Sequence, residues 1–151
     1  MPILNGVCNE TFRLYSTVPQ SLRVAIRPTT ILGYPVKKGT MIILTPYGIN
    51  RSPQQWGPDA DEFKPSRWID KDTGKPNNSG GAQSNYSLMT FLHGPRSCIG
   101  QGFAKAELRA LLAVLVGTFN MELNDPNYRP LRVGSVTTKP SQGMPLKFTT
   151  V

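Results

Sequence analysis

The sequence is poor in the residues that build zinc sites and disulfide scaffolds. Its 151 residues include only two cysteines, Cys8 and Cys98, and one histidine, His93. A structural zinc site needs four such ligands, and a disulfide scaffold needs several cysteine pairs in a short chain. Two cysteines far apart in the sequence, with a single histidine, therefore exclude both classes of protein.

Long hydrophobic runs are also missing. The longest apolar run, Leu111–Val116, is far shorter than the roughly 20 residues that span a bilayer. No charged leader followed by an apolar stretch comes after Met1. We therefore expect neither a membrane anchor nor a targeting peptide within this chain.

Acidic residues are scarce, since Asp and Glu number 9 against 17 Lys and Arg, which gives a formal net charge of +8. Such a charge suits nucleic acid, an acidic membrane surface or an acidic protein partner. The basic residues are scattered rather than clustered, which favours a solvated surface for most of them and no nucleic-acid partner. The apolar fraction of 38% predicts a real core, and 14 Gly with 14 Pro predict many loops.

The first part of the chain predicts a helix followed by a small sheet. Pro2 suits a first helical turn, and helical spacing continues to Tyr15. The apolar face of this helix is formed by Ile3, Leu4, Val7, Cys8, Phe12 and Tyr15. Residues 22–27 alternate with period two, which predicts a strand whose core face carries Leu22, Val24 and Ile26. Residues 41–44 predict a second strand.

Residues 46–95 carry repeated Pro and Gly with almost no periodicity, which predicts a long irregular meander. Its aromatic residues Trp56, Phe63 and Trp68 predict that the meander packs. Within it, residues 77–81 resemble a linker and predict a flexible insertion.

The pattern then predicts a long helix over residues 101–120 and short strands over 131–138 and 146–151. The whole chain is therefore expected to be mainly α with small β-sheets, an α+β fold.

The segment from Phe91 to Gly100 delivers a cysteine on a glycine-punctuated loop just before this long helix. The N–H groups and dipole at a helix N-terminus, together with Arg96, favour the thiolate of Cys98. Cys98 is therefore a candidate metal ligand or nucleophile. The alternative is a small buried cysteine with no chemical role.

The pattern Phe-x-x-Gly-x-Arg-x-Cys-x-Gly resembles the haem-binding signature of the cytochrome P450 family, the haem-thiolate monooxygenases. The resemblance implies that Cys98 is the proximal ligand of the iron of haem b. It also implies that Gly94 and Gly100 let the backbone approach the macrocycle closely, and that Phe91 shields the sulfur from water.

Two further segments resemble the same family in the same order. Glu10-Thr11-Phe12-Arg13 is similar to its Glu-x-x-Arg helix, and Phe63-Lys64-Pro65-Ser66-Arg67-Trp68 is similar to the segment that supplies a second arginine. The resemblance implies that Glu10, Arg13 and Arg67 form a structural network. If these residues are buried they must satisfy each other, because an unpaired buried charge costs several kcal/mol.

The resemblance gives roles to further basic residues. Arg96 and Arg23 match positions that reach the haem propionates, with Arg27 as a competitor for the role of Arg23. His93 matches a position with no ligand role, so we expect it to pack or hydrogen-bond within the loop. The stretches Val18–Val24 and Lys139–Met144 match parts of the family that line the substrate pocket.

The implied fold is the C-terminal portion of the cytochrome P450 fold: helix, small sheet, long meander, cysteine haem loop, long helix and terminal β-hairpin. Residues 1–151 would then be an incomplete, C-terminal haem-binding portion of one larger domain. The segment at residues 63–68 best fits the eukaryotic microsomal type. A parent of that type would be held in the endoplasmic reticulum membrane by an anchor upstream of this chain.

The implied activity is a monooxygenase that uses O₂ to insert one oxygen atom into an apolar small molecule. Electrons would come from NADPH through a flavoprotein reductase or another donor. We expect the donor to dock on the face of Arg96, Lys105 and Arg109, and the isolated chain to be inactive. The alternatives are an isomerase or lyase of the same fold and a non-catalytic basic interaction fragment.

Overall fold

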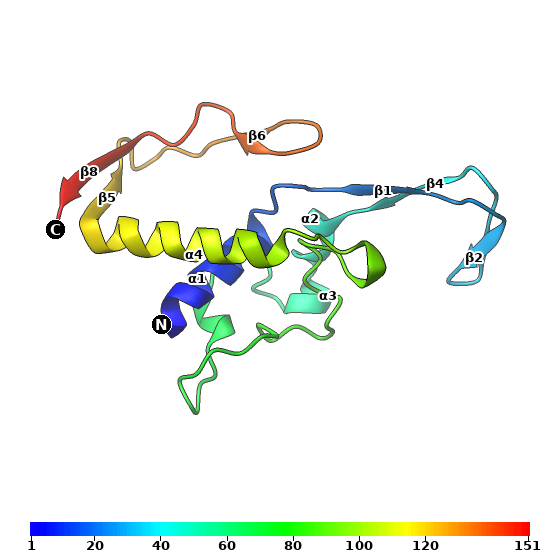
Figure 1. Cartoon of the computed structure of the whole chain (residues 1–151), viewed down its shortest axis with the longest axis horizontal. Helices are drawn as coiled ribbons and strands as arrows, with labels where there is room; N and C mark the ends of the chain where they lie inside the picture. Colours follow the sequence, from blue (N-terminus) through cyan, green and yellow to red (C-terminus); the bar gives the residue numbers. More distant parts are fainter.

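The computed structural model describes residues 1–151 and has two long helices joined by a meander, with four two-stranded β-ladders (Figure 1). The helices are α1 (Pro2–Leu14), α2 (Pro46–Ile49), α3 (Pro53–Trp56) and α4 (Gln101–Thr118), with 3₁₀ turns η1 (Pro65–Trp68) and η2 (Gly94–Arg96). The strands are β1 (Ser21–Val24), β2 (Thr29–Ile31), β3 (Tyr34–Val36), β4 (Met41–Leu44), β5 (Phe119–Leu123), β6 (Arg132–Val133), β7 (Lys139–Pro140) and β8 (Leu146–Thr150). The predicted α+β class is confirmed.

Helix α1 begins and ends almost where the sequence predicts, but its buried face differs from the predicted one. The buried residues are Gly6, Cys8, Glu10, Arg13 and Leu14. Ile3 and Tyr15, predicted to face the core, are 59% and 55% exposed. The prediction was wrong for these two residues because the face of α1 that packs on η1 carries Glu10 and Arg13, whose charges pair with each other.

The contact between α1 and η1 depends on the absence of a side chain at Gly6. A β-carbon at this position would lie 2.6 Å from the carbonyl oxygen of Pro65. Because that oxygen belongs to the backbone, it cannot move aside without shifting η1. Gly6 therefore sets how closely the two elements approach.

We expect Gly6→Ala to destabilise the protein by about 1–3 kcal/mol, because overpacking a close contact costs this much. Thermal unfolding measures the loss. The matched control is Gly117→Ala in α4, where a β-carbon meets nothing within 4 Å. This control should be neutral or slightly stabilising, since alanine favours a helix over glycine. Equal unfolding temperatures for the two variants would contradict the prediction.

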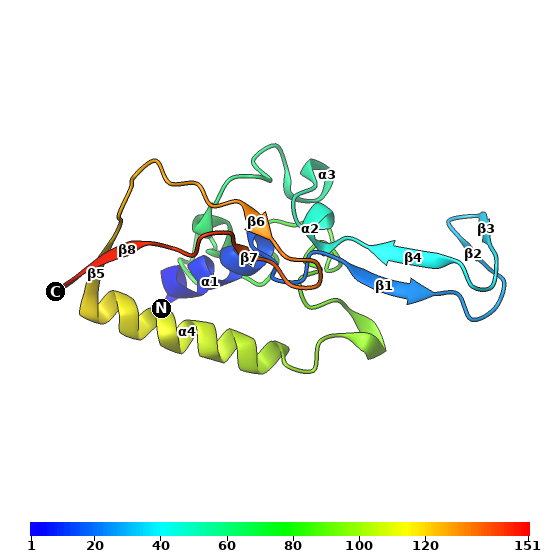
Figure 2. The same ribbon diagram turned by 90° about the horizontal axis from the view of Figure 1, so that it is seen from above.

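Strands β1 and β4 form an antiparallel ladder that projects from the helices and carries the β2–β3 hairpin at its far end (Figure 2). The predicted strand over 22–27 is shorter, ending at Val24. Leu22, Val24 and Ile26, predicted to face the core, are 50%, 56% and 84% exposed. That prediction was wrong because a two-stranded ribbon that projects from the fold leaves this face uncovered.

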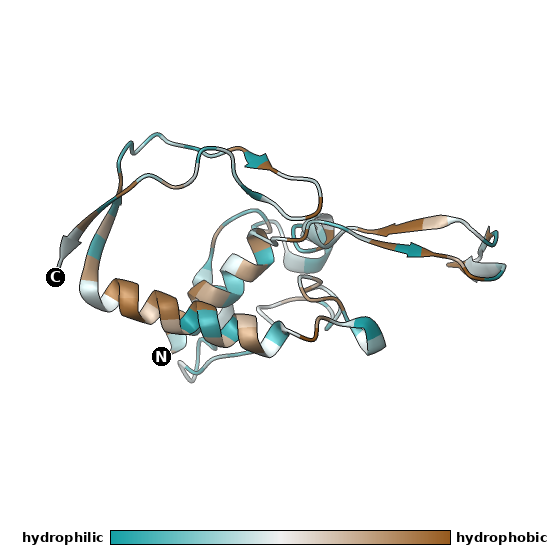
Figure 3. Ribbon diagram, turned by 45° about the horizontal axis from the view of Figure 1, so that its top comes forward, coloured by the Kyte–Doolittle hydropathy of each residue, from teal (hydrophilic) through white to brown (hydrophobic).

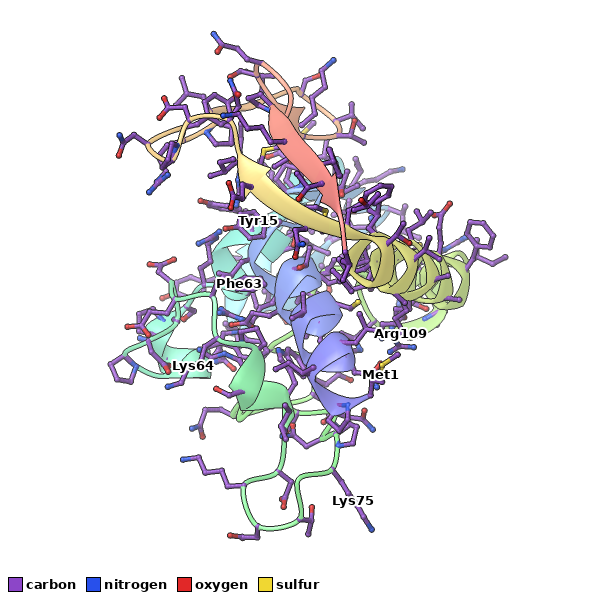
Figure 4. All side chains as sticks on the ribbon, turned by 90° about the vertical axis from the view of Figure 1, so that its left-hand side faces the viewer. Met1, Tyr15, Phe63, Lys64, Lys75 and Arg109 are labelled. Atoms are coloured by element: carbon purple, nitrogen blue, oxygen red, sulfur yellow. The ribbon has the colours of Figure 1, made fainter.

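The meander packs around two tryptophans, as the sequence predicts. Trp56 and Trp68 are 3% and 1% exposed, and their ring centroids lie 5.8 Å apart. Ala60 completes this small core. Phe63 differs from the prediction, since it is 45% exposed and lies beside Tyr15, with ring centroids 6.2 Å apart (Figure 4).

Residues 77–81 differ from the predicted linker at two positions, since Gly80 is buried and Asn77 half-buried, while Asn78, Ser79 and Gly81 are exposed. The N–H of Asn77 donates to the carbonyl of Trp68 (2.9 Å), and its side-chain amide donates to that of Arg67 (3.0 Å). Gly80 has a φ of +60°, and a β-carbon there would lie 3.0 Å from the indole of Trp68. Glycine is therefore used here for close contact with a core ring and not for flexibility.

The C-terminal part pairs differently from the predicted hairpin. Helix α4 ends at Thr118, and residues 119–123, expected partly as helix, form β5, which pairs antiparallel with β8. The expected strand over 131–138 is reduced to β6, which pairs with β7. Figure 3 shows apolar residues along α4, and this helix buries none of its residues.

Candidate haem-binding site

The loop before α4 is closed by its own backbone. The N–H of Cys98 donates to the carbonyl oxygen of Phe91 (2.9 Å), and that of Ser97 donates to Gly94 (3.0 Å). Gly94 has a φ of +76°, in the left-handed region that favours glycine. These bonds hold Cys98 immediately before the first turn of α4.

The thiol of Cys98 is exposed, which excludes the alternative of a small buried cysteine; the buried cysteine is Cys8. Beside it, Ile99 and Phe103 are fully exposed and 73% exposed. A β-carbon on Gly100 would lie 3.9 Å from the Cys98 sulfur, at an ordinary van der Waals distance. The Cys98 sulfur therefore lies on an exposed, apolar surface. Gly100, which has no side chain, leaves the space beside the sulfur open.

Phe91 lies half-buried between the two long helices. Its ring meets that of Phe12 edge-on with centroids 5.0 Å apart, and the Nζ of Lys105 lies 5.7 Å from its centroid. Burial, with a contribution from the Arg109 charge, lowers the pKa of Lys105. Lys105 and Arg109 are both half-buried, so the expected donor-docking face exposes only part of each side chain.

The arginines assigned to propionates have no acidic partner. Arg96 and Arg27 are exposed, and Arg23 is half-buried, donating only to the Ser21 hydroxyl (2.9 Å) and the Leu22 carbonyl (2.8 Å). None of the three forms a salt bridge, although other arginines of the chain do. Their guanidinium groups are free to donate hydrogen bonds to a carboxylate from outside the chain.

His93 packs within the loop, as expected from the sequence. Its Nε2 lies 3.2 Å from the carbonyl oxygen of Leu88, and its ring contacts that of Tyr86 with centroids 5.0 Å apart.

The structure brings Glu10, Arg13 and Arg67 together around one buried carboxylate. Arg13 donates to both oxygens of Glu10 at 2.9 and 2.8 Å, and Arg67 donates its Nε–H at 2.9 Å. The backbone N–H of Lys64 and the indole N–H of Trp68 donate at 2.9 Å each. Glu10 and Arg13 are both fully buried.

Burial alone raises the pKa of Glu10, but the hydrogen bonds from Arg13, Lys64 and Trp68 and the charge of Arg13 outweigh it, so the pKa is lowered. Arg13 also donates to the carbonyls of Asn50 (2.7 Å) and Glu62 (3.0 Å). The network therefore fixes the meander on α1 by charge-assisted bonds.

Asn50 is a central residue that the sequence did not reveal. Its fully buried amide donates to the Arg13 carbonyl (3.1 Å), to Ser16 Oγ (3.0 Å) and to Thr90 Oγ1 (2.8 Å). Its oxygen accepts the N–H of Met89 at 2.7 Å. Asn50 thus connects the end of α1 to residues 89–90, the segment that leads into the cysteine loop. A single asparagine after a short helical turn gives no signal of this role.

The protein side chains at this site can supply one ligand, the sulfur of Cys98. They therefore suit a metal ion whose other ligands come from a cofactor. The chain has no group of three or more His, Cys, Asp or Glu side chains that could hold a metal ion. One exposed cysteine on an apolar surface, two residues after the exposed Arg96, fits the iron of a porphyrin that carries carboxylates.

The cytochrome P450 family model matches residues 1–146. The chain belongs to the cytochrome P450 family. The P450 family binds haem iron, and the Phe91–Gly100 loop lies within the residues that the family model matches. No helix of this P450 chain has the length and apolarity needed to cross a membrane.

Fungal P450 sequences are among the relatives. The chain is 51% identical over 152 residues to cytochrome P450 monooxygenase sphH of Aspergillus fumigatus and 47% identical over 148 residues to cytochrome P450 monooxygenase ptmK of Penicillium ochrochloron. All of this chain is covered in the first comparison and 98% in the second, against 27% and 29% of the relatives. The chain therefore resembles P450s of eukaryotes and spans less than a third of their length.

The fold comparison agrees. The crystal structure of the heme domain of a cytochrome P450DA mutant superposes with a TM-score of 0.79 at 25% identity, covering 98% of this chain and 31% of that one. The arrangement of helices, small sheets and meander is thus that of a part of the P450 fold.

Proposed function

We propose that this chain is the C-terminal haem-binding portion of a cytochrome P450 monooxygenase, with Cys98 as the proximal thiolate ligand of haem b. The observation that carries the proposal is the exposed Cys98 sulfur, held before α4 by the bond to Phe91 and flanked by apolar side chains. When bound, haem ligated by a thiolate supplies O₂ activation.

The surrounding residues have distinct roles in this proposal. Arg96 and Arg23 bind the propionates, with Arg27 as a competitor for the second position. Phe91 limits water on the sulfur side of the loop, and Gly94 and Gly100 permit a close approach of the macrocycle. Glu10, Arg13 and Arg67 hold the meander beneath the loop and take no part in the chemistry.

The rest of the enzyme lies outside this chain. The exposed apolar residues of α4, among them Leu111, Val114 and Val116, support a larger domain that covers them. The substrate is an apolar small molecule, and electrons come from NADPH through a flavoprotein reductase. The parent enzyme is held at the endoplasmic reticulum membrane by an anchor outside residues 1–151.

Replacing Cys98 tests the proposal. In the full-length enzyme, Cys98→Ala should abolish the red-shifted band of the reduced carbon monoxide complex, because that band requires a thiolate ligand. The matched control is Cys8→Ala, which removes the other thiol of the chain and should keep the band. A band retained in Cys98→Ala, or missing from the unmutated enzyme, would refute the proposal.

A further inference from the structure

The guanidinium group of Arg132 lies between two tyrosines at the end of α1. It is 5.1 Å from the ring centroid of Tyr15 and 4.9 Å from that of Tyr47. Its Nη2 donates to the carbonyl oxygen of Leu14 (2.8 Å), and Arg51 donates to the same oxygen (2.6 Å). The carbonyl that ends α1 thus accepts hydrogen bonds from two arginines, which complement the negative end of the helix dipole.

This contact joins distant parts of the chain. Arg132 and Leu14 are 118 positions apart, and Arg132 forms no salt bridge. Its charge is engaged instead by the carbonyl and the two rings, where a planar guanidinium both stacks and donates. Strand β6 is therefore fastened to the end of α1 through one side chain.

A second contact holds the hairpin formed by β6 and β7 (residues 132–140, the C-terminal hairpin) against the residues that follow α1. The N–H of Thr138 donates to the carbonyl oxygen of Thr17 at 2.7 Å. Between the two contacts, Gly134 has a φ of +122°, and a β-carbon there would overlap the carbonyl oxygen of Thr137. The turn that links Arg132 to Thr138 is therefore tight, and a shift of Arg132 must also move Thr138.

A cavity of about 780 Å³ lies beside these contacts. Its lining includes Tyr15 and Thr17 from the end of α1, Arg132 and Thr138 from the C-terminal hairpin, and Met144. The width of this cavity is consequently set by how the hairpin sits on the end of α1.

We propose that Arg132 is a positioning residue that sets the separation between residues 18–24 and residues 139–144, which follow Thr17 and Thr138 directly, and through it the shape of the substrate pocket. This inference rests on the proposed function and on the resemblance to the P450 family, which implies that residues 18–24 and 139–144 line the substrate pocket. Arg132 acts through the Thr17–Thr138 contact and does not touch the haem ligand.

The matched control is Arg129→Ala. Arg129 lines the same cavity, but its guanidinium donates only to the carbonyls of Pro126 (3.0 Å) and Tyr128 (2.8 Å) in its own loop. Both arginines contribute one positive charge, so only Arg132→Ala should loosen the hairpin from α1.

The experiment uses two iron-binding probes of different size in the full-length enzyme, imidazole and 4-phenylimidazole, followed by their difference spectra. In Arg132→Ala the dissociation constant of 4-phenylimidazole should rise about tenfold, since a misplaced wall weakens only the ligand that reaches it. The constant for imidazole and the carbon monoxide band should stay unchanged. Hydrogen exchange should quicken at the amide of Thr138, and Arg129→Ala should change none of these.

The outcomes separate this inference from the proposed function. An intact carbon monoxide band with unchanged 4-phenylimidazole binding in Arg132→Ala overturns the positioning role alone. The absence of that band in the unmutated enzyme overturns the proposed function and this inference together. If Arg132→Ala does not fold, Arg132→Lys, which keeps the charge without the planar stack, should show the same loss in smaller degree; unchanged affinity in that variant overturns the inference.

Discussion

Glu10→Gln should lower the free energy of unfolding by about 3–5 kcal/mol, since removing one partner of a buried ion pair leaves uncompensated charge. The carboxylate accepts five hydrogen bonds from Arg13, Lys64, Arg67 and Trp68, and it is fully buried. A glutamine at this position has one accepting oxygen instead of two. Its NH₂ group would face N–H donors that now bond to the second carboxylate oxygen, and none of these can accept a hydrogen bond. Urea unfolding followed by tryptophan fluorescence measures the change, since Trp68 is one of the donors.

The control is an ion pair at the surface. Asp61 pairs with Arg51 at 2.9 Å, but its side chain is 77% exposed. Asp61→Asn should therefore cost less than about 1 kcal/mol. Comparable losses of unfolding free energy in Glu10→Gln and Asp61→Asn would contradict the prediction that the buried network stabilises the fold more than a surface ion pair does.

The same carboxylate predicts how stability depends on pH. The pKa of Glu10 is lowered from its ordinary value of 4.5, so the folded state binds a proton less readily than the unfolded state. Its contribution to stability is complete above the unfolded pKa and is lost as the pH falls through the folded pKa. Urea midpoints measured from pH 7 downward should decline below about pH 4.5. The decline should be shallower in Glu10→Gln.

Asn50→Ala is expected to be the other severely destabilising change, with a loss of about 3 kcal/mol or more, since each buried group left unpaired costs about 1–3 kcal/mol. The N–H of Met89 and the carbonyl of Arg13 lose their amide partner. Because Asn50 also bonds Thr90, the segment entering the cysteine loop should loosen. Thermal unfolding and haem retention in the full-length enzyme measure the two effects.

Asn124→Ala is the matched control for this change, because Asn124 is exposed. It should leave both the unfolding temperature and the haem content unchanged. Haem retention equal to that of the unmutated enzyme in Asn50→Ala would contradict the link between Asn50 and the loop.

Features encoded within one turn or one loop could be predicted from the sequence. Glu10 and Arg13 are three positions apart and meet on one helix face, so local spacing is enough to predict that they pair. The place of Cys98 on a loop just before α4 follows from the glycines around it and from the helical pattern after it. The same holds for the two long helices, whose periodicity is strong.

Features that depend on distant partners could not be predicted. The alternation of Leu22, Val24 and Ile26 indicates a strand but not whether anything covers one of its faces. The strand β5 follows α4 without a break, and only its pairing with β8 separates the two. Glycines at residues 80–81 indicate flexibility until the ring of Trp68 is known to lie against Gly80.

The network around Glu10 has a consequence for the order in which the chain can fold during its synthesis. Helix α1 leaves the ribosome before the meander does, and a 13-residue helix is marginal on its own in water. The donors that compensate its carboxylate follow 54 to 58 positions later, at Lys64, Arg67 and Trp68. The network around Glu10 can therefore be completed only after residue 68 has emerged, and a product truncated before Lys64 lacks three of the four residues that donate to this carboxylate.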